Sequence, residues 1–245
     1  MKKLLKNLTY SVLSRFSFPD AVILMYHSID NNNEFFTVSP DEFERQLEHL
    51  RKNNFNVIKL GELANSVKNN SIKPNTVVLT FDDGFKDNYT NAFPILKRLS
   101  FPATIFITTS LINSSISGRN GTHFNLLDRD EIKEMSDSGL VEIGAHCHNH
   151  VKLAKLSAAE ITNELSVSKK ILEEITGSTV NSLAYPYGSF NEEVKAISLK
   201  YFNIACSVEK GRINMGSDPM EFKRNSIDSQ VGFTQFKGIV KFGRV

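Results

Sequence analysis

The stretch that decides the fold is Thr76-Val77-Val78-Leu79-Thr80-Phe81-Asp82-Asp83-Gly84. Its β-branched and apolar residues predict a buried strand that ends in two adjacent carboxylates and a glycine. Neighbouring side chains point to opposite faces of a strand, so Asp82 and Asp83 can face one cleft only where the chain turns, and Gly84 can supply that turn. The pair could hold a metal and move a proton, or it could simply begin a solvated loop, because Asp and Gly favour turns.

A second polar cluster favours the metal hypothesis. The run 141–145 predicts a strand, which leads into His146-Cys147-His148-Asn149-His150. His146 and His150 are four residues apart, a spacing that lets two imidazoles reach one ion from a helical turn or a tight loop. Three of the six histidines lie in this segment, which argues against unrelated polar loop residues. One Asp and two His leave a metal with open coordination positions, as in catalytic sites.

Strands and helices alternate along the chain. Strand-like runs occur at residues 21–26, 55–60, 77–81, 103–108, 141–144, 182–185 and 202–207. Capping boxes at Ser39–Glu42 and Ser157–Glu160 predict the starts of two helices. This alternation predicts an α/β fold with a mainly parallel sheet, and the polar clusters follow strands, where an α/β barrel builds its active site. Residues 113–124, rich in Ser, Gly and Asn, predict a long loop that could border the substrate cleft.

Length and composition fit one globular domain. The chain has 245 residues, of which 40% are apolar and 23% are charged, and these values are ordinary for a single substantial core. A net charge of +2 gives no case for a nucleic-acid partner. Two cysteines, Cys147 and Cys206, are too few for a disulfide framework. Cys147 lies beside a candidate ligand and could itself bind metal.

These motifs resemble those of the polysaccharide deacetylase family, carbohydrate esterase family 4, also called the nodulation-type chitooligosaccharide deacetylase homology domain. The run 80–84 matches the first motif, and His146 to His150 resembles the second, with Cys147 in place of a hydroxyl residue. Tyr185-Pro186-Tyr187-Gly188 resembles the third motif, and the resemblance spans most of residues 20–230. It implies a distorted (β/α) barrel in one catalytic domain, residues 21–245. It also implies metal-dependent removal of acetyl groups from N-acetylated sugars of a glycan or polysaccharide.

The resemblance also implies roles for individual residues. Asp82 would be the general base, and Asp83, His146 and His150 would hold a divalent metal, which we expect to be zinc. The backbone N–H of Tyr187 would help to stabilise the oxyanion. The sequence departs from the family pattern at two places. Ala184 stands where the third motif usually carries an Arg that orients the base, and no histidine follows His150 to supply the general acid of the last motif.

Two other residues could fill these places. The segment Leu24-Met25-Tyr26-His27-Ser28-Ile29 resembles the start of the exported poly-N-acetylglucosamine deacetylases, whose permuted motif order puts the acid histidine first. His27 is therefore the candidate acid, and the alternative is a histidine capping or buried at a strand end. Arg224 is the candidate replacement for the missing Arg, although any surface Arg would give the same pattern.

The N-terminal residues 1–20 predict a peripheral segment. Lys2, Lys3 and Lys6 resemble the start of a signal peptide, but polar residues interrupt the apolar run that follows, and no small-residue cleavage site stands out. No stretch approaches the roughly 20 apolar residues of a membrane span. We expect a helix packed on the domain of a cytoplasmic protein. Weak contact of this segment with a membrane surface, and export, are the alternatives.

Other functions fit the residues less well. A phosphatase with an aspartyl nucleophile needs Asp-x-Asp, whereas Asp82 and Asp83 are adjacent. A sugar O-acetyl esterase stays open because an ester needs no general acid for its leaving group, whereas an amide does. A catalytically impaired sugar-binding homologue also stays open, because the third and last motifs depart from the family pattern.

Overall fold

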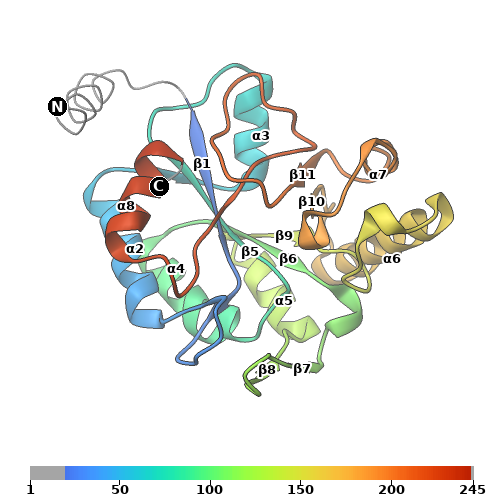
Figure 1. Cartoon of the computed structure of the whole chain (residues 1–245), viewed down its shortest axis with the longest axis horizontal. Coiled ribbons are helices and arrows are strands. Elements are labelled where there is room, and N and C mark those ends of the chain that lie inside the picture. Colours follow the sequence, from blue (N-terminus) through green and yellow to red (C-terminus); the bar gives the residue numbers. More distant parts are fainter. Residues whose placement is uncertain (1–19, 244–245) are drawn as a thin grey trace, which may run out of the picture.

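The computed structural model describes residues 20–243 (Figure 1). The N-terminal helix expected within residues 1–20 lies, apart from Asp20, outside the described residues. Among residues 20–243, no helix has the length and apolar character needed to cross a bilayer.

One eight-stranded sheet organises the molecule. Its strands follow the order β11-β10-β9-β6-β5-β1-β12, with β4 beside β5, and all of these strand pairs are parallel. Parallel pairing places the carboxyl ends of the strands at one edge. The strands are β1 (Ala21–Tyr26), β4 (Asn56–Ile58), β5 (Thr76–Phe81), β6 (Ala103–Ile107), β9 (Val141–Ala145), β10 (Ser182–Ala184), β11 (Ile204–Cys206) and β12 (Asn225–Ser226).

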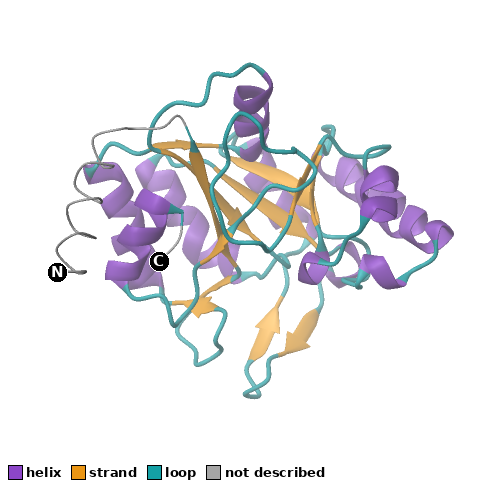
Figure 2. Ribbon diagram, turned by 45° about the horizontal axis from the view of Figure 1, so that its top comes forward, coloured by secondary structure: helices purple, strands orange, loops and turns teal. Residues whose placement is uncertain are grey.

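Helices cover the outside of the curled sheet (Figure 2). They are α2 (Pro40–Lys52), α3 (Leu60–Lys68), α4 (Phe93–Leu99), α5 (Arg129–Asp137), α6 (Ala158–Thr176), α7 (Glu192–Ser198) and α8 (Phe233–Phe242), with a π-helical turn η1 (Asn88–Ala92) before α4. The predicted capping box of α6 is confirmed, because Ser157 and Glu160 each accept the other's backbone N–H. At α2, Ser39 accepts the N–H of Glu42, and Pro40 opens the helix. The arrangement confirms the predicted distorted (β/α) barrel.

Alternate residues of the central strands pack on two sides. In β1, Val22, Leu24 and Tyr26 belong to the large core between sheet and helices, whereas Ala21 and Ile23 join a smaller core with residues of β6, β10 and β11. Every residue of β1 and β5 is buried. Burial on both faces explains why these strands are continuously apolar instead of alternating with polar residues.

The segment that precedes β12 joins the two edges of the sheet. Phe222 forms a bridge with Cys206 of β11, and its carbonyl accepts the N–H of Ser207 at 2.9 Å. Three residues later, Asn225 of β12 lies opposite Leu24 of β1. The chain between these contacts therefore crosses from one edge strand to the other, and it carries Arg224 into the barrel.

The predicted long loop at residues 113–124 is wrong in part. It contains an antiparallel hairpin of β7 (Ser115–Ser117) and β8 (His123–Asn125). Ile116 lies opposite Phe124, and Phe124 packs in a small core with Phe85 and Leu126. This apolar anchor lets a stretch rich in turn residues pair with itself. The predicted strand at 55–60 ends at Ile58, because Leu60 begins α3.

A substitution of Gly144 in β9 tests the tight packing behind the loop that contains His146 and His150. A Cβ added there would lie 2.5 Å from the Phe106 ring and 2.7 Å from Ser182 Oγ. We expect Gly144→Ala to lower the free energy of unfolding by about 1–3 kcal/mol in urea titrations, because the core cannot accept the methyl group without moving. In α8, Gly238→Ala adds a methyl group to open space and should be neutral or stabilising. Equal effects of the two substitutions would contradict this account.

Candidate metal centre

A buried ion pair lies at the carboxyl end of β5. The Nη atoms of Arg224 donate to both oxygens of Asp82, at 2.6 and 2.8 Å, and its Nε donates to the carbonyl of Ser207 at 3.0 Å. Arg224 is fully buried and Asp82 is 3% exposed. Two parallel hydrogen bonds between a guanidinium and a carboxylate fix the orientation of both planes. Arg224 thus contacts the candidate base itself.

Electrostatics keep Asp82 ionised. Burial alone would raise the pKa of its carboxyl group, but the positive charge and the hydrogen bonds of Arg224 hold that pKa well below its ordinary value. The pKa of Arg224 is raised in turn, because the attraction of Asp82 outweighs the effect of its own burial. At neutral pH the site therefore contains a fixed carboxylate.

A reversal of the backbone turns Asp83 toward the same end of the barrel, where the carboxyl ends of the strands lie. Its φ is 72° and that of Gly84 is 80°, so two successive residues are left-handed. Asp tolerates this conformation better than most residues. The predicted turn is present, but it begins at Asp83 itself, one residue before the glycine.

Asp83 forms a compact cluster with two histidines. The Nε2 atoms of His146 and His150 lie 3.5 and 3.3 Å from the same Asp83 Oδ1 atom. One ligand atom from each residue lies within 4.8 Å of the other two, a group that could hold a metal ion. His146 is buried, whereas Asp83 and His150 are partly exposed, so the cluster is open on one side.

The groups around His146 fix the orientation of its ring and favour its neutral form. Its Nδ1 lies 2.7 Å from the carbonyl oxygen of Ala184, which leaves Nε2 facing Asp83. A carbonyl oxygen that accepts the N–H of one ring nitrogen fixes the tautomer of a histidine that binds metal through the other. Burial lowers the pKa of His146 in spite of the nearby Asp82 and Asp83, and this favours the neutral form that metals bind.

The ligand segment is a tight loop. Cys147 and His150 have φ values of 62° and 50°, which no helical turn contains. The backbone N–H groups of Thr109 and Ser110 donate to the carbonyls of Cys147 and His148. Cys147 is buried and is not part of the Asp83–His146–His150 group, and burial raises the pKa of its thiol well above the usual value.

His27 lies on the neighbouring strand. Because β1 and β5 pair with Tyr26 opposite Phe81, His27 and Asp82 follow at adjacent strand ends. The N–H of Asp82 donates to the carbonyl of Tyr26, and the carbonyl of His27 accepts the side-chain amide of Asn88 at 2.7 Å. The predicted acid and base thus lie at the same edge of the barrel.

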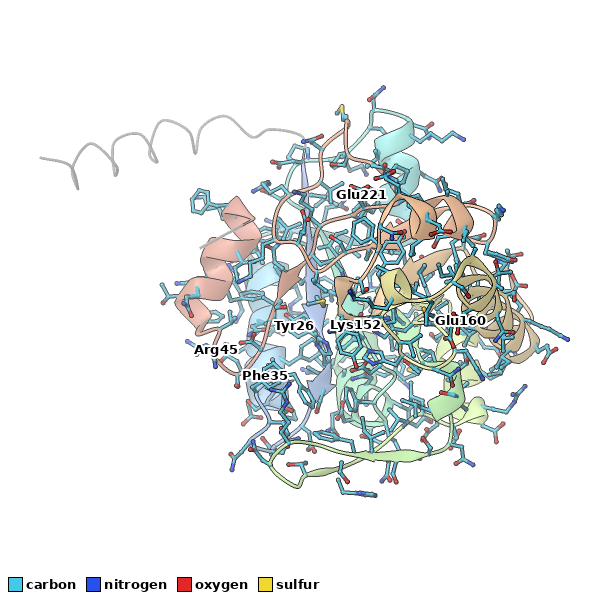
Figure 3. The ribbon with its side chains drawn as sticks, turned by 45° about the vertical axis from the view of Figure 1, so that its right-hand side comes forward. Tyr26, Phe35, Arg45, Lys152, Glu160 and Glu221 are labelled. Atoms are coloured by element: carbon cyan, nitrogen blue, oxygen red, sulfur yellow. The ribbon has the colours of Figure 1, made fainter. Side chains whose placement is uncertain are left out.

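Tyr187 borders the other side of the cluster. Its ring centroid lies 4.6 Å from that of His150, and the residue is 59% exposed. Lys152 places its Nζ 5.4 Å from the centre of the same ring (Figure 3). Tyr187 has a left-handed φ of 58°, which turns the backbone after β10. The predicted site residues other than His27 are thus linked by direct contacts, and His27 lies at the neighbouring strand end.

One buried acidic residue of this region was missed by the sequence analysis. Glu164 of α6 contacts the loop between His146 and His150. Its only sequence signal was its position next to Leu165, which lies on the apolar stripe of the predicted helix.

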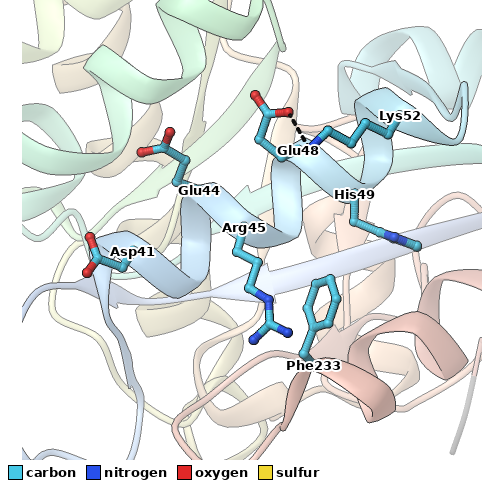
Figure 4. Close-up of a pocket in the computed structure, with 7 residues that line it drawn as sticks. All are labelled: Asp41, Glu44, Arg45, Glu48, His49, Lys52 and Phe233. Carbon is cyan, nitrogen blue, oxygen red and sulfur yellow. Dashed lines mark ion pairs between the residues drawn. The ribbon is translucent and has the colours of Figure 1, made fainter.

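A separate surface hollow of about 510 Å³ lies between α2 and α8, where Arg45 stacks over Phe233 (Figure 4). None of the predicted site residues lines this hollow.

Comparisons with known proteins give consistent results. The model of the family described as polysaccharide deacetylase matches residues 69–202. A poly-β-1,6-N-acetyl-D-glucosamine N-deacetylase of Staphylococcus aureus is 32% identical over 178 residues, covering 68% of this chain and 60% of that protein. The structure of a Bacillus cereus polysaccharide deacetylase is 30% identical, with a TM-score of 0.77, over 90% of this chain and 69% of that chain. A Streptococcus pyogenes deacetylase in complex with acetate is 25% identical, with a TM-score of 0.79, over 92% and 99%.

The chain is shorter than the curated relatives it matches. It covers 64% of a Bacillus subtilis homologue, with which it shares 33% identity over 192 residues, and 60% of the Staphylococcus aureus protein.

Substitution of Arg224 tests the buried ion pair. Arg224→Met leaves the Asp82 carboxylate buried without a partner, so we expect the free energy of unfolding at pH 7 to fall by about 3–5 kcal/mol. In the unmodified chain the lowered pKa of Asp82 stabilises the fold above pH about 4, and this contribution is lost as pH falls further. In the variant, burial raises that pKa, so acid relieves the penalty.

Urea titrations at pH 7 and pH 4 measure this difference. The gap between the two proteins should shrink at pH 4, and the double variant Asp82→Asn/Arg224→Met should be more stable at pH 7 than Arg224→Met alone. A gap that widens in acid would refute the assignment.

Proposed function

The chain belongs to the polysaccharide deacetylase family, and on this premise we propose that it is a metal-dependent hydrolase that removes acetyl groups from the N-acetylated sugars of a polysaccharide. One observation carries the proposal. A compact Asp83–His146–His150 cluster lies beside a carboxylate, Asp82, that a buried guanidinium keeps ionised and oriented. This arrangement supplies a metal site with a base next to it.

The chemistry of the donor set fits a catalytic divalent ion. One carboxylate and two imidazoles converge, and the partial exposure of Asp83 and His150 leaves room for water and substrate. Asp83, His146 and His150 would hold the ion, and zinc is the metal that we propose. When bound, it would polarise the acetyl carbonyl and lower the pKa of the attacking water.

Asp82 is the proposed general base. Its carboxylate takes the proton of the attacking water, and Arg224 prevents the carboxylate from rotating away. The same guanidinium makes Asp82 a weaker base, because it stabilises the ionised form. The role of Arg224 is therefore orientation, at some cost in basicity.

His27 and Tyr187 are proposed to complete the reaction. His27 protonates the leaving amine, which an amide requires because an amine anion leaves poorly. The backbone N–H of Tyr187 donates to the oxyanion that forms on the acetyl carbon. The positions of the two residues support these roles. His27 follows β1, the strand that pairs with β5 before Asp82, and the Tyr187 ring contacts that of His150.

The proposed substrate is a polysaccharide that contains N-acetylglucosamine. The Staphylococcus aureus relative is named for such a substrate. The upstream position of His27 also resembles the permuted motif order of the poly-N-acetylglucosamine deacetylases. The cytoplasmic location and the contact of the N-terminal segment with a membrane surface stay predictions.

Adjacent aspartates allow a matched test of the metal site and the base. We expect Asp83→Ala to lose bound metal and acetate release together. Asp82→Asn should keep the metal and lose turnover by about 10²–10⁴-fold, the usual contribution of a general base. Metal analysis of the purified proteins and acetate release from N-acetylglucosamine oligomers measure both effects. Full metal occupancy in Asp83→Ala, or near-normal turnover in Asp82→Asn, would contradict these roles.

His27→Ala tests the proposed acid. We expect metal content to stay unchanged and hydrolysis of an N-acetyl sugar to fall far more than hydrolysis of an aryl acetate, whose leaving group needs no proton. His49→Ala, on α2, serves as the control and should affect neither substrate. Equal losses on both substrates would remove His27 from this role. Little loss on the amide would leave the acid to another group, and rapid release from O-acetyl sugars alone would favour an esterase.

A further inference from the structure

A buried carboxylate from a helix is hydrogen-bonded inside the ligand loop. Glu164 of α6 is 6% exposed. Its Oε2 accepts the backbone N–H of His148 at 2.9 Å and that of Asn149 at 2.8 Å, and its Oε1 accepts the side-chain amide of Asn149 at 2.7 Å. One side chain thus binds two of the three residues that lie between His146 and His150.

The loop needs such support because its backbone is unfavourable. Cys147 and His150 are both left-handed, a backbone conformation that is unfavourable for residues other than glycine. A strained loop persists only where its surroundings hold it. On one side, the N–H groups of Thr109 and Ser110 bind two loop carbonyls. On the other side, Glu164 accepts the backbone N–H groups of His148 and Asn149.

Cys147 increases the importance of this contact. It occupies the motif position where the resemblance expects a hydroxyl residue, and a thiol is a weak hydrogen-bond donor. Its side chain is buried near Glu164, whose charge contributes to the raised pKa of the thiol. Cys147 therefore contributes packing at this position, and the Glu164 carboxylate supplies hydrogen bonds to the loop backbone.

We propose that Glu164 is a positioning residue that sets the metal affinity of the site without touching the metal. It holds His148 and Asn149 so that His146 and His150 converge on Asp83. This inference rests on the proposed function in one respect, since it requires that the cluster binds a divalent ion.

The test measures the dissociation constant for Zn²⁺ by competition with a chromophoric chelator, together with the Tm of the metal-free proteins. We expect Glu164→Ala to weaken zinc binding by about 10–100-fold, the usual effect of losing a residue that supports metal ligands without touching the metal. Glu164→Gln should bind zinc almost as tightly as the unmodified chain. Its amide oxygen can still accept both backbone N–H groups, and Asn149 can turn its own amide to match.

A helix-cap variant separates positioning from general stability. Glu160 lies exposed at the start of the same helix (Figure 3), where it forms the capping box with Ser157. Glu160→Ala should lower the metal-free Tm and leave zinc affinity unchanged. Glu164→Ala should lower both.

Several outcomes would overturn the inference. Unchanged zinc affinity in Glu164→Ala would overturn it, and so would equal weakening by Gln and Ala, because the charge alone would then explain the effect. If Glu164→Ala does not fold, Glu164→Asp decides, since it withdraws the oxygens by one methylene and should also weaken binding. Failure of the unmodified chain to bind zinc or another divalent ion would instead overturn the proposed function, and this inference with it.

Discussion

The Arg224–Asp82 ion pair is the interaction on which the rest of the site depends. It joins the segment before β12 to the end of β5, so it fastens the piece of chain that bridges the open edges of the barrel. The pair is buried, and removal of either charge would leave the other unpaired in an environment of low polarity. The same segment that bridges the two edge strands therefore fixes the proposed base.

Backbone geometry gives two adjacent aspartates different environments. Asp82 continues the alternation of β5 and points toward the same side as Thr80, whose hydroxyl lies 3.3 Å from Arg224. Asp83 would point to the opposite side, but its left-handed backbone turns it to the mouth, where the histidines lie. One carboxylate becomes fully paired and the other stays available to a cation. A single reversal of the chain thus separates the two proposed roles.

Two positions of this chain lack the side chains that the family motifs carry, and residues from other segments contact the site instead. Ala184 lacks the guanidinium of the third motif, and Arg224 supplies one from a distant segment. Ala184 still contributes its carbonyl oxygen, which contacts His146. Cys147 lacks the hydroxyl of the second motif, while Glu164 binds the loop backbone.

The sequence by itself determined the local elements and the candidate ligands of a metal. Continuous apolar runs specified the buried strands, and capping residues specified helix starts, because these signals act over a few residues. The residue types and spacing of Asp82, Asp83, His146 and His150 also indicated a metal site. Only the tertiary structure decided that Arg224 contacts Asp82, that His27 lies beside it and that Glu164 enters the ligand loop. These contacts join residues far apart in the chain, and their partners are chosen by sheet pairing and barrel closure, which no local pattern encodes.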